Sequence, residues 1–211
     1  MRKLNHLFLT SLLAFASLSA QALDKPAAKA VAPITPTAAV VPALSISADG
    51  ATVLSKDGKL VWMRCSIGQK WLDGSCQEDP KKFDHRDAAN QIKLMNMSGG
   101  YAGANDWRLP TAEELQSLVF CDQGYTSSTA VIKYADNKQS TPLPQACEGE
   151  GYLRPTIDPI AFPKTARTWY WTSTPDTERV INLWAVSFAT GSFTPISRHH
   201  QTVARAVRTA K

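Results

Sequence analysis

The chain has 211 residues, of which 44% are hydrophobic and 19% charged, and its formal net charge is +5. The apolar fraction excludes a wholly disordered or collagen-like chain, and no apolar run reaches the about 18 residues that a membrane span needs. Residues 1–22 contain two basic residues and no acidic ones, so the rest carries a net charge of only +3. That charge is too small to indicate a nucleic-acid partner.

Residues 1–22 have the pattern of a secretory signal peptide. Arg2 and Lys3 precede an apolar run from Leu7 to Leu18, and Ala20-Gln21-Ala22 is a small-x-small cleavage site. The run is too short for a membrane anchor, so we expect cleavage after Ala22. No cysteine lies near that site, which disfavours a lipid anchor. The pattern predicts export to the periplasm, the cell surface or the medium.

The four cysteines are Cys65, Cys76, Cys121 and Cys147. An even number in an exported chain predicts two disulfides, for which three pairings exist. Turn-forming residues separate the first two cysteines, and a long polar stretch separates the last two. These spacings favour pairing between sequence neighbours. They do not fit zinc, whose paired ligands lie about two to four residues apart.

Residues 23–44 contain seven Ala, four Pro and no aromatic residue. Such a segment cannot bury enough surface to fold and is typical of a semi-extended tether. The alternative is a spacer without a role. We expect one folded domain over residues 45–211.

The domain begins with a predicted β-hairpin and two predicted helices. Asp57-Gly58 lies between the apolar runs Thr52–Leu54 and Leu60–Met63, which is a strong hairpin signal. Asp84 is a candidate cap for a first helix that ends at Gly99-Gly100. Its expected buried face consists of Ala88, Ala89, Ile92 and Met95.

A capping box predicts the second helix. The Thr111 hydroxyl would accept from the Glu114 amide, while the Glu114 carboxylate reaches back. Its expected buried residues are Leu115, Leu118 and Val119.

Residues 122–156 are polar, contain Gly and Pro, and predict a long loop that is either functional or poorly ordered. The remainder is strand-like, with short segments at Tyr170–Thr172, Trp184–Phe188 and Val203–Val207. Alternation in short segments indicates an antiparallel sheet with one face on the core. The whole pattern predicts an α+β fold in which two helices pack on a small twisted sheet.

Several motifs in this order resemble the C-terminal domain of Lcl-type collagen-like adhesins, a bacterial family long described as a domain of unknown function. The resemblance covers about residues 50–208. It rests on the segments Leu60–Cys65, Gly68–Trp71, Asp106–Leu115, Ile157–Asp158, Phe162–Pro163, Tyr170–Thr174, Trp184–Phe188 and Val207–Arg208.

The resemblance implies a C-type-lectin-like fold with a variable loop region, and a secreted or surface location. In the adhesins the domain is associated with sulfated glycosaminoglycans and with trimers. This chain lacks a Gly-X-Y stalk, so trimerisation and host adhesion do not transfer, and its oligomeric state stays open. The family supplies no catalytic residues to carry over.

The signature residues have both a functional and a structural interpretation. Asp106 and Arg108 are either a ligand-binding charge pair or groups that fix the loop before Pro110, and we favour the second. We expect the aromatic signature residues to be buried. They are Trp62, Trp71, Trp107 and Trp184, while the side on which the signature residue Trp171 lies stays open.

The candidate ligand-binding residues lie near the C-terminus. Arg198, His199, His200 and Arg205 belong to a basic stretch that could hold an acidic or sulfated glycan, since guanidinium groups suit sulfate. The alternative is a charged edge strand, on which the two histidines would point to opposite faces and make a poor metal pair. Along a strand, Tyr170 should face the side opposite to Trp169 and Trp171. One of these two sides is expected to pack on the core, and the other is a candidate aromatic platform on which a sugar stacks.

We expect no cofactor. The calcium-binding triplets of lectins are absent, and the loop acids are scattered. Hydrolase, metalloprotease and phosphate-loop motifs are absent too, and a likeness of topology to formylglycine-generating enzymes transfers no activity. We therefore predict a non-catalytic binding module for a glycan or an envelope protein. The alternatives are an assembly component of a periplasmic or pilus-like complex and, remotely, an enzyme.

Overall fold

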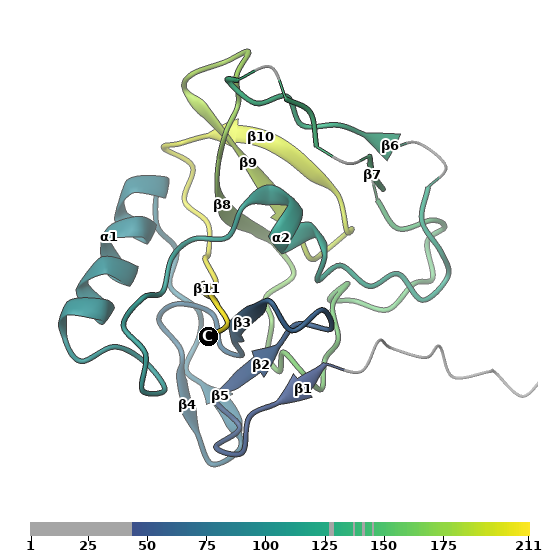
Figure 1. The fold of residues 1–211 in the computed structure, drawn as a ribbon. Helices are drawn as coiled ribbons and strands as arrows, with labels where there is room; N and C mark the ends of the chain where they lie inside the picture. Colours follow the sequence, from purple (N-terminus) through teal and green to yellow (C-terminus); the bar gives the residue numbers. More distant parts are fainter. Residues whose placement is uncertain (1–43, 127–128, 137, 141, 145) are drawn as a thin grey trace, which may run out of the picture. The chain divides into compact units, whose positions relative to one another are not determined.

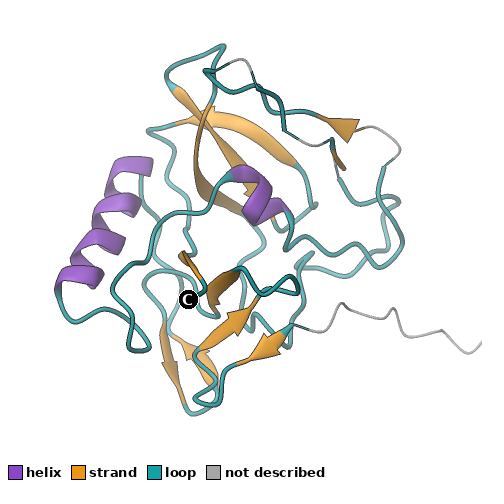
Figure 2. Cartoon of the chain, viewed as in Figure 1, coloured by secondary structure: helices purple, strands orange, loops and turns teal. Residues whose placement is uncertain are grey.

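The computed structural model describes residues 44–126, 129–136, 138–140, 142–144 and 146–211. The predicted signal peptide and all of the predicted tether except Leu44 lie outside the described residues. The described part is α+β, as predicted, with two helices and mostly antiparallel strands (Figures 1 and 2). None of its helices is long and apolar enough to cross a membrane.

The predicted hairpin is confirmed and forms the centre of a four-stranded antiparallel sheet. In its turn, the Asp57 carboxylate accepts hydrogen bonds from the Ser55 hydroxyl and the Lys59 amide. Gly58 there has φ +71°, a backbone conformation that glycine adopts without a steric penalty. The sheet order is β1-β2-β3-β11. The strands are β1 (Ser45–Ile46), β2 (Thr52–Leu54), β3 (Leu60–Met63) and β11 (Val207–Thr209).

A second sheet has the order β10-β9-β8, where the sequence predicted a single sheet. The Ser187 amide donates to the Ser192 carbonyl, and the Arg198 amide donates to the Ile181 carbonyl. Because hydrogen-bonded residues alternate along an antiparallel pair, the nitrogen of Pro195 faces the outer edge of β10. Proline there removes an edge donor and discourages pairing with another strand. The strands are β8 (Trp169–Pro175), β9 (Asn182–Ser187) and β10 (Phe193–Ser197), and two small hairpins pair β4 (Lys70–Leu72) with β5 (Ser75–Gln77) and β6 (Thr129–Ala130) with β7 (Leu143–Pro144).

Both predicted helices are present. In α1 (His85–Met97) the Asp84 side chain accepts from the Asp87 amide, which confirms the cap. Ala88 and Ile92 are buried, but Ala89 is exposed, because the helix buries a narrower stripe than predicted. The second helix, α2 (Ala112–Gln116), begins with the predicted capping box and packs against β8 and β9.

Two apolar clusters fill the domain, and β8 lies between them. Tyr170 belongs to the larger cluster, together with Trp62, Leu115 and Phe162. Trp171 belongs to the cluster that includes Ile92 of α1. The predicted alternation along β8 is therefore confirmed, but both faces are buried, because α1 covers the second face.

The two disulfides pair sequence neighbours, as predicted. Cys65 bonds to Cys76 of β5, and Cys121 bonds to Cys147. The Cys121–Cys147 bond spans most of the long loop predicted over 122–156. It ties this loop back to the segment that directly follows α2. In the chain-entropy description, closing loops of this size stabilises the fold by about 3 kcal/mol each.

Candidate functional site

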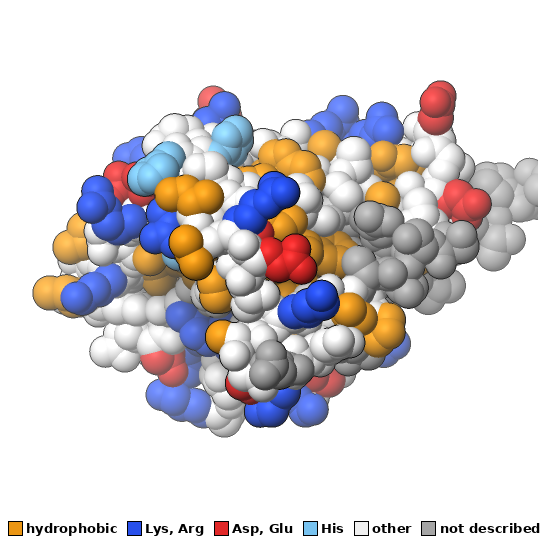
Figure 3. Space-filling view, turned by 90° about the horizontal axis from the view of Figure 1, so that it is seen from above, with side chains coloured by type: hydrophobic (Ala, Val, Ile, Leu, Met, Phe, Trp, Pro, Cys, Tyr) orange, Lys and Arg blue, Asp and Glu red, His pale blue; other side chains and the backbone are white. Residues whose placement is uncertain are grey.

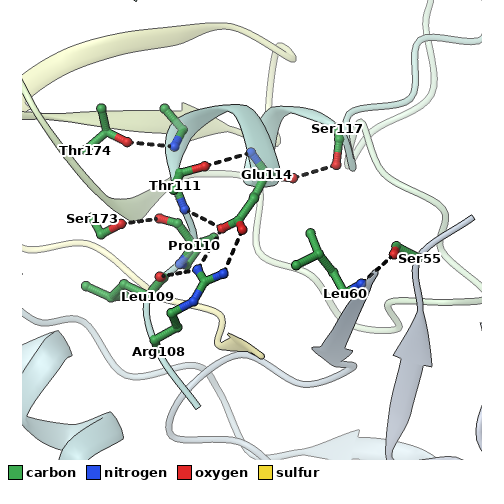
Figure 4. Close-up of polar contacts among 11 residues, drawn as sticks. Ser55, Leu60, Arg108, Leu109, Pro110, Thr111, Glu114, Ser117, Ser173 and Thr174 are labelled. Atoms are coloured by element: carbon green, nitrogen blue, oxygen red, sulfur yellow. Dashed lines mark hydrogen bonds and ion pairs between the residues drawn. The ribbon is translucent and has the colours of Figure 1, made fainter. Parts of the chain in front are cut away.

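The signature around Arg108 forms the entry to α2 (Figure 4). The Arg108 guanidinium donates two hydrogen bonds to the Glu114 carboxylate, each 2.7 Å long. Glu114 also accepts from the Thr111 amide at 2.7 Å, and Ser173 of β8 donates to the Pro110 carbonyl. Hydrogen bonds from Arg108 and Thr111 lower the pKa of Glu114 despite its burial, so this carboxyl is ionised. These groups are occupied within the chain, as the structural interpretation predicted.

Asp106 does not pair with Arg108. Its carboxylate accepts from the Arg208 guanidinium at 2.6 Å and lies 3.3 Å from the Lys211 ammonium. The hydrogen bond from Arg208 holds the pKa of Asp106 at about 2. Asp106 therefore joins the end of the chain to the loop before α2.

Arg205 cannot bind a ligand at the surface, which corrects the prediction. Its side chain is 0% exposed. The guanidinium donates to the Met63 and Arg64 carbonyls and to the Thr165 hydroxyl, and it lies 4.7 Å from the centre of the Phe162 ring. It crosslinks segments distant in sequence from inside the core. The sequence interpretation failed because local charge density does not indicate which side of a segment faces the interior.

Tyr170 is also wrong as a candidate sugar platform. It is 0% exposed, and its hydroxyl lies 2.9 Å from the Ser66 hydroxyl and accepts from the Ala166 amide. Of the aromatic signature residues, Trp62 and Trp107 are buried as predicted, and Trp171, whose side the sequence left open, is buried too. Trp71 and Trp184 are only partly buried.

Arg198, His199 and His200 are exposed, as a ligand-binding role requires. Arg198 and His199 lie in a turn that follows β10, and not on a strand, so the predicted alternation of the two histidines does not apply. Arg198 donates to the Val180 carbonyl of the β8–β9 connection. With Asp84 and His85 at the start of α1, Arg198 and His199 line a cavity of about 260 Å³, in which burial lowers the pKa of His85.

Arg198 also lines the larger of two adjoining cavities, which together form what we call the loop groove. Their volumes are about 280 and 770 Å³, and Lys133, Asp176 and Thr177 line both. The long loop supplies one wall, and the β8–β9 connection with β9 and β10 supplies the other. Figure 3 looks onto this end of the domain, where basic, hydrophobic and acidic side chains are interspersed. The further lining residues are Val131, Tyr134, Ala135, Gln139, Pro175, Glu178, Arg179, Val180, Asn182, Trp184, Thr194, Pro195 and Arg198.

The groove holds an aromatic side chain and a buried acid that the sequence analysis did not assign to a site. Trp184 of β9 is partly buried and lines the smaller cavity. Asp176 is 8% exposed and accepts from the Glu178 amide. Nothing in the sequence around either residue distinguishes it from a framework residue. The β8–β9 hairpin brings them near each other, since the Asp176 amide donates to the Asn182 carbonyl, and the long loop packed opposite them encloses the cavity.

Charges of both signs line the loop groove. Lys133 lies 3.6 Å from Glu178. Arg179 and Arg198 have no carboxylate partner among the residues described here. Burial raises the pKa of the Tyr134 hydroxyl above its usual value, so this group stays neutral. The groove therefore offers two guanidinium groups that no described carboxylate neutralises, beside neutral hydrogen-bonding groups.

A comparison of the sequence with models of known protein families identifies the family of this chain. The model of the Lcl C-terminal domain matches residues 51–208. The chain belongs to the Lcl C-terminal domain family. A search of curated proteins found no match. Within the described part of the Lcl domain, no group of three His, Cys, Asp or Glu side chains is arranged to hold a metal ion.

Proposed function

We propose that this Lcl domain is an exported, non-catalytic binding module that holds an acidic or sulfated glycan in the loop groove. Two disulfides suit an oxidising compartment such as the periplasm or the cell surface. We further propose that the domain has a C-type-lectin-like scaffold and that the loop groove belongs to its variable loop region. The polar groups of the helix entry are engaged in the framework, whereas the groove keeps side chains such as Asn182 and Thr194 that make no hydrogen bond within the described chain.

The two arginines of the loop groove that have no carboxylate partner among the described residues carry this proposal. Arg179 and Arg198 are exposed and lie on the rim of the two cavities. A guanidinium fork binds sulfate or carboxylate through paired, charge-assisted hydrogen bonds. A polymer of acidic sugars spanning both cavities would contact both arginines.

Chromatography of the purified domain on immobilised heparin tests the proposal. We expect retention that falls steeply with salt, because exposed charges are screened. Arg179→Ala with Arg198→Ala should elute at clearly lower salt. The control pair, Lys56→Ala with Lys59→Ala, removes the same charge from the β2–β3 turn and should elute close to the wild type. Wild-type protein that ignores heparin and a broad panel of acidic glycans would overturn the proposal.

A second candidate function is an assembly role with an envelope protein. Val180 is 81% and Ile181 48% exposed at the β8–β9 connection, and exposed apolar side chains at a loop tip favour a protein partner. Crosslinking in cells should then capture an envelope component, and Val180→Ser with Ile181→Ser should abolish that product. An unchanged crosslinking pattern would exclude this surface.

A further inference from the structure

The smaller cavity of the loop groove is lined by the indole of Trp184, one side of which packs against the hydrophobic core. Trp184 packs against Phe193 of β10, with ring centres 5.3 Å apart and planes tilted by 38°. Its neighbours on β9, Leu183 and Ala185, are buried, whereas Trp184 is partly exposed. Phe193 therefore fixes the orientation of the indole, and the remaining surface of the indole lines the cavity.

Polar side chains without a partner surround this ring. Within the described residues, the side-chain amide of Asn182, the Thr194 hydroxyl and the Trp184 Nε1–H make no hydrogen bond. Thr172, on the neighbouring strand β8, donates to the Trp184 carbonyl at 2.6 Å. Asp176 uses one carboxylate oxygen for the Glu178 amide at 3.0 Å and leaves the other unpaired. The cavity thus contains donors and acceptors beside the indole whose partners must come from solvent or a ligand.

This combination suits a sugar ring better than other ligands of similar size. A pyranose has an apolar face of C–H groups that packs on an indole, and hydroxyls around its rim that both donate and accept. The free oxygen of Asp176 attracts hydroxyl donors and repels a sulfate placed directly against it, so the acidic groups of a ligand are left to the rim arginines, Arg179 of this cavity and Arg198 of the larger one. At about 280 Å³, the cavity lies at the lower end of the about 300–1,000 Å³ of typical ligand pockets, which favours a single ring.

Resting on the function proposed above, we infer that this cavity is a monosaccharide subsite in which one uncharged face of a hexose stacks on Trp184. Asp176 and Asn182 hydrogen-bond its hydroxyls. Acidic substituents of neighbouring sugars extend into the larger cavity toward Arg198. The subsite makes the domain specific for a polysaccharide, because a polymer that carries sulfate without sugar rings gains only the arginine contacts.

The experiment compares two probes, a sulfated heparin oligosaccharide and poly(vinyl sulfate), which carries the charge but no rings. We expect Trp184→Ala to weaken oligosaccharide binding by about tenfold or more, as the loss of an aromatic anchor does, and poly(vinyl sulfate) binding by less than about twofold. Trp184→Phe should retain part of the affinity. Trp71→Ala is the matched control, since Trp71 is also a partly exposed tryptophan but lies on the β4–β5 hairpin. It should leave binding of both probes unchanged.

Asp176→Asn gives a second readout that a loss of folding cannot imitate. Asparagine can still accept from the Glu178 amide but no longer repels anions. We expect weaker oligosaccharide binding and equal or tighter poly(vinyl sulfate) binding. Equal binding of the two probes by the wild type, or an oligosaccharide affinity that Trp184→Ala leaves intact, would overturn the subsite and leave the glycan function standing. Wild-type protein that binds no acidic glycan would overturn both.

Discussion

The entry to α2 and the loop groove differ in how their polar groups are satisfied. At the entry, Arg108, Thr111 and Glu114 hydrogen-bond one another. In the groove, Asn182 and Thr194 have no side-chain partner in the described chain. The polar groups of the entry are paired with one another and stabilise the fold, whereas the open groups beside the aromatic ring of the groove are available for recognition. The difference separates framework from binding surface without any catalytic residue to guide the choice.

Two tryptophans on paired strands show the same contrast. Trp171 of β8 is 0% exposed, and its Nε1 donates to the Phe83 carbonyl at 2.9 Å. Trp184 of β9 is partly exposed, and its Nε1 has no acceptor among the described residues. The chain itself satisfies the buried donor of Trp171, while the donor of Trp184, which lies at a cavity, is left for a ligand.

The largest expected effect on stability comes from the core under α2. Leu115 is 0% exposed, and Leu115→Ala should lower the free energy of unfolding by about 2–5 kcal/mol through lost burial and a residual cavity. Val180→Ala, at the rim of the groove, should change it by less than about 0.5 kcal/mol. Urea unfolding of both variants measures the difference. Similar losses would mean that the groove is part of the framework.

A pair of threonine variants sharpens the comparison. Thr111→Val removes the hydroxyl that caps α2 and should lower the free energy of unfolding by about 1 kcal/mol. Thr194→Val removes a hydroxyl that makes no bond within the described chain and introduces a residue that β-strands favour, so a change within about 0.5 kcal/mol is expected. Thermal and urea unfolding provide the test. A loss at Thr194 as large as that at Thr111 would contradict the division into framework and groove.

The smallest effect concerns pH. Hydrogen bonding from Arg208 lowers the pKa of Asp106 from 3.8 to about 2. A carboxyl whose pKa is lower in the folded than in the unfolded state stabilises the fold above its unfolded pKa. It loses that contribution as the pH falls through its folded pKa. The wild type should therefore lose stability between pH 3.8 and about 2 partly through this group.

Asp106→Asn isolates that contribution. The variant should show a flatter fall in stability over this range, and added salt should reduce its difference from the wild type, since Asp106 is solvent-exposed. Urea unfolding at several acidic pH values measures both. Identical slopes for the variant and the wild type would show that Asp106 contributes nothing to the acid response.

Local patterns predicted the framework well. The Asp57-Gly58 turn, the Asp84 cap and the capping box are interactions within a few residues, so their signal is present in the sequence. The disulfide pairing followed from spacing. The division into two sheets and the exposure of Ala89 did not, because both depend on which elements pack together.

The candidate site was predicted poorly for the same reason. Arg198, His199 and His200 are exposed as expected, but Arg205 is buried, although it belongs to the same basic stretch. Trp184 was assigned to the core because a large aromatic in a strand is usually buried. Its position at a cavity depends on the long loop, whose residues are distant in sequence.

The sequence alone determined the helix caps, the first hairpin, the pairing of the cysteines and the membership of the Lcl domain family, because each depends on short-range order or on the order of motifs. Only the tertiary structure decided which charges are buried and which polar groups remain unpaired. The reason is that burial and pairing depend on contacts between segments tens of residues apart, and the periodicity of a single segment does not specify what covers each of its faces.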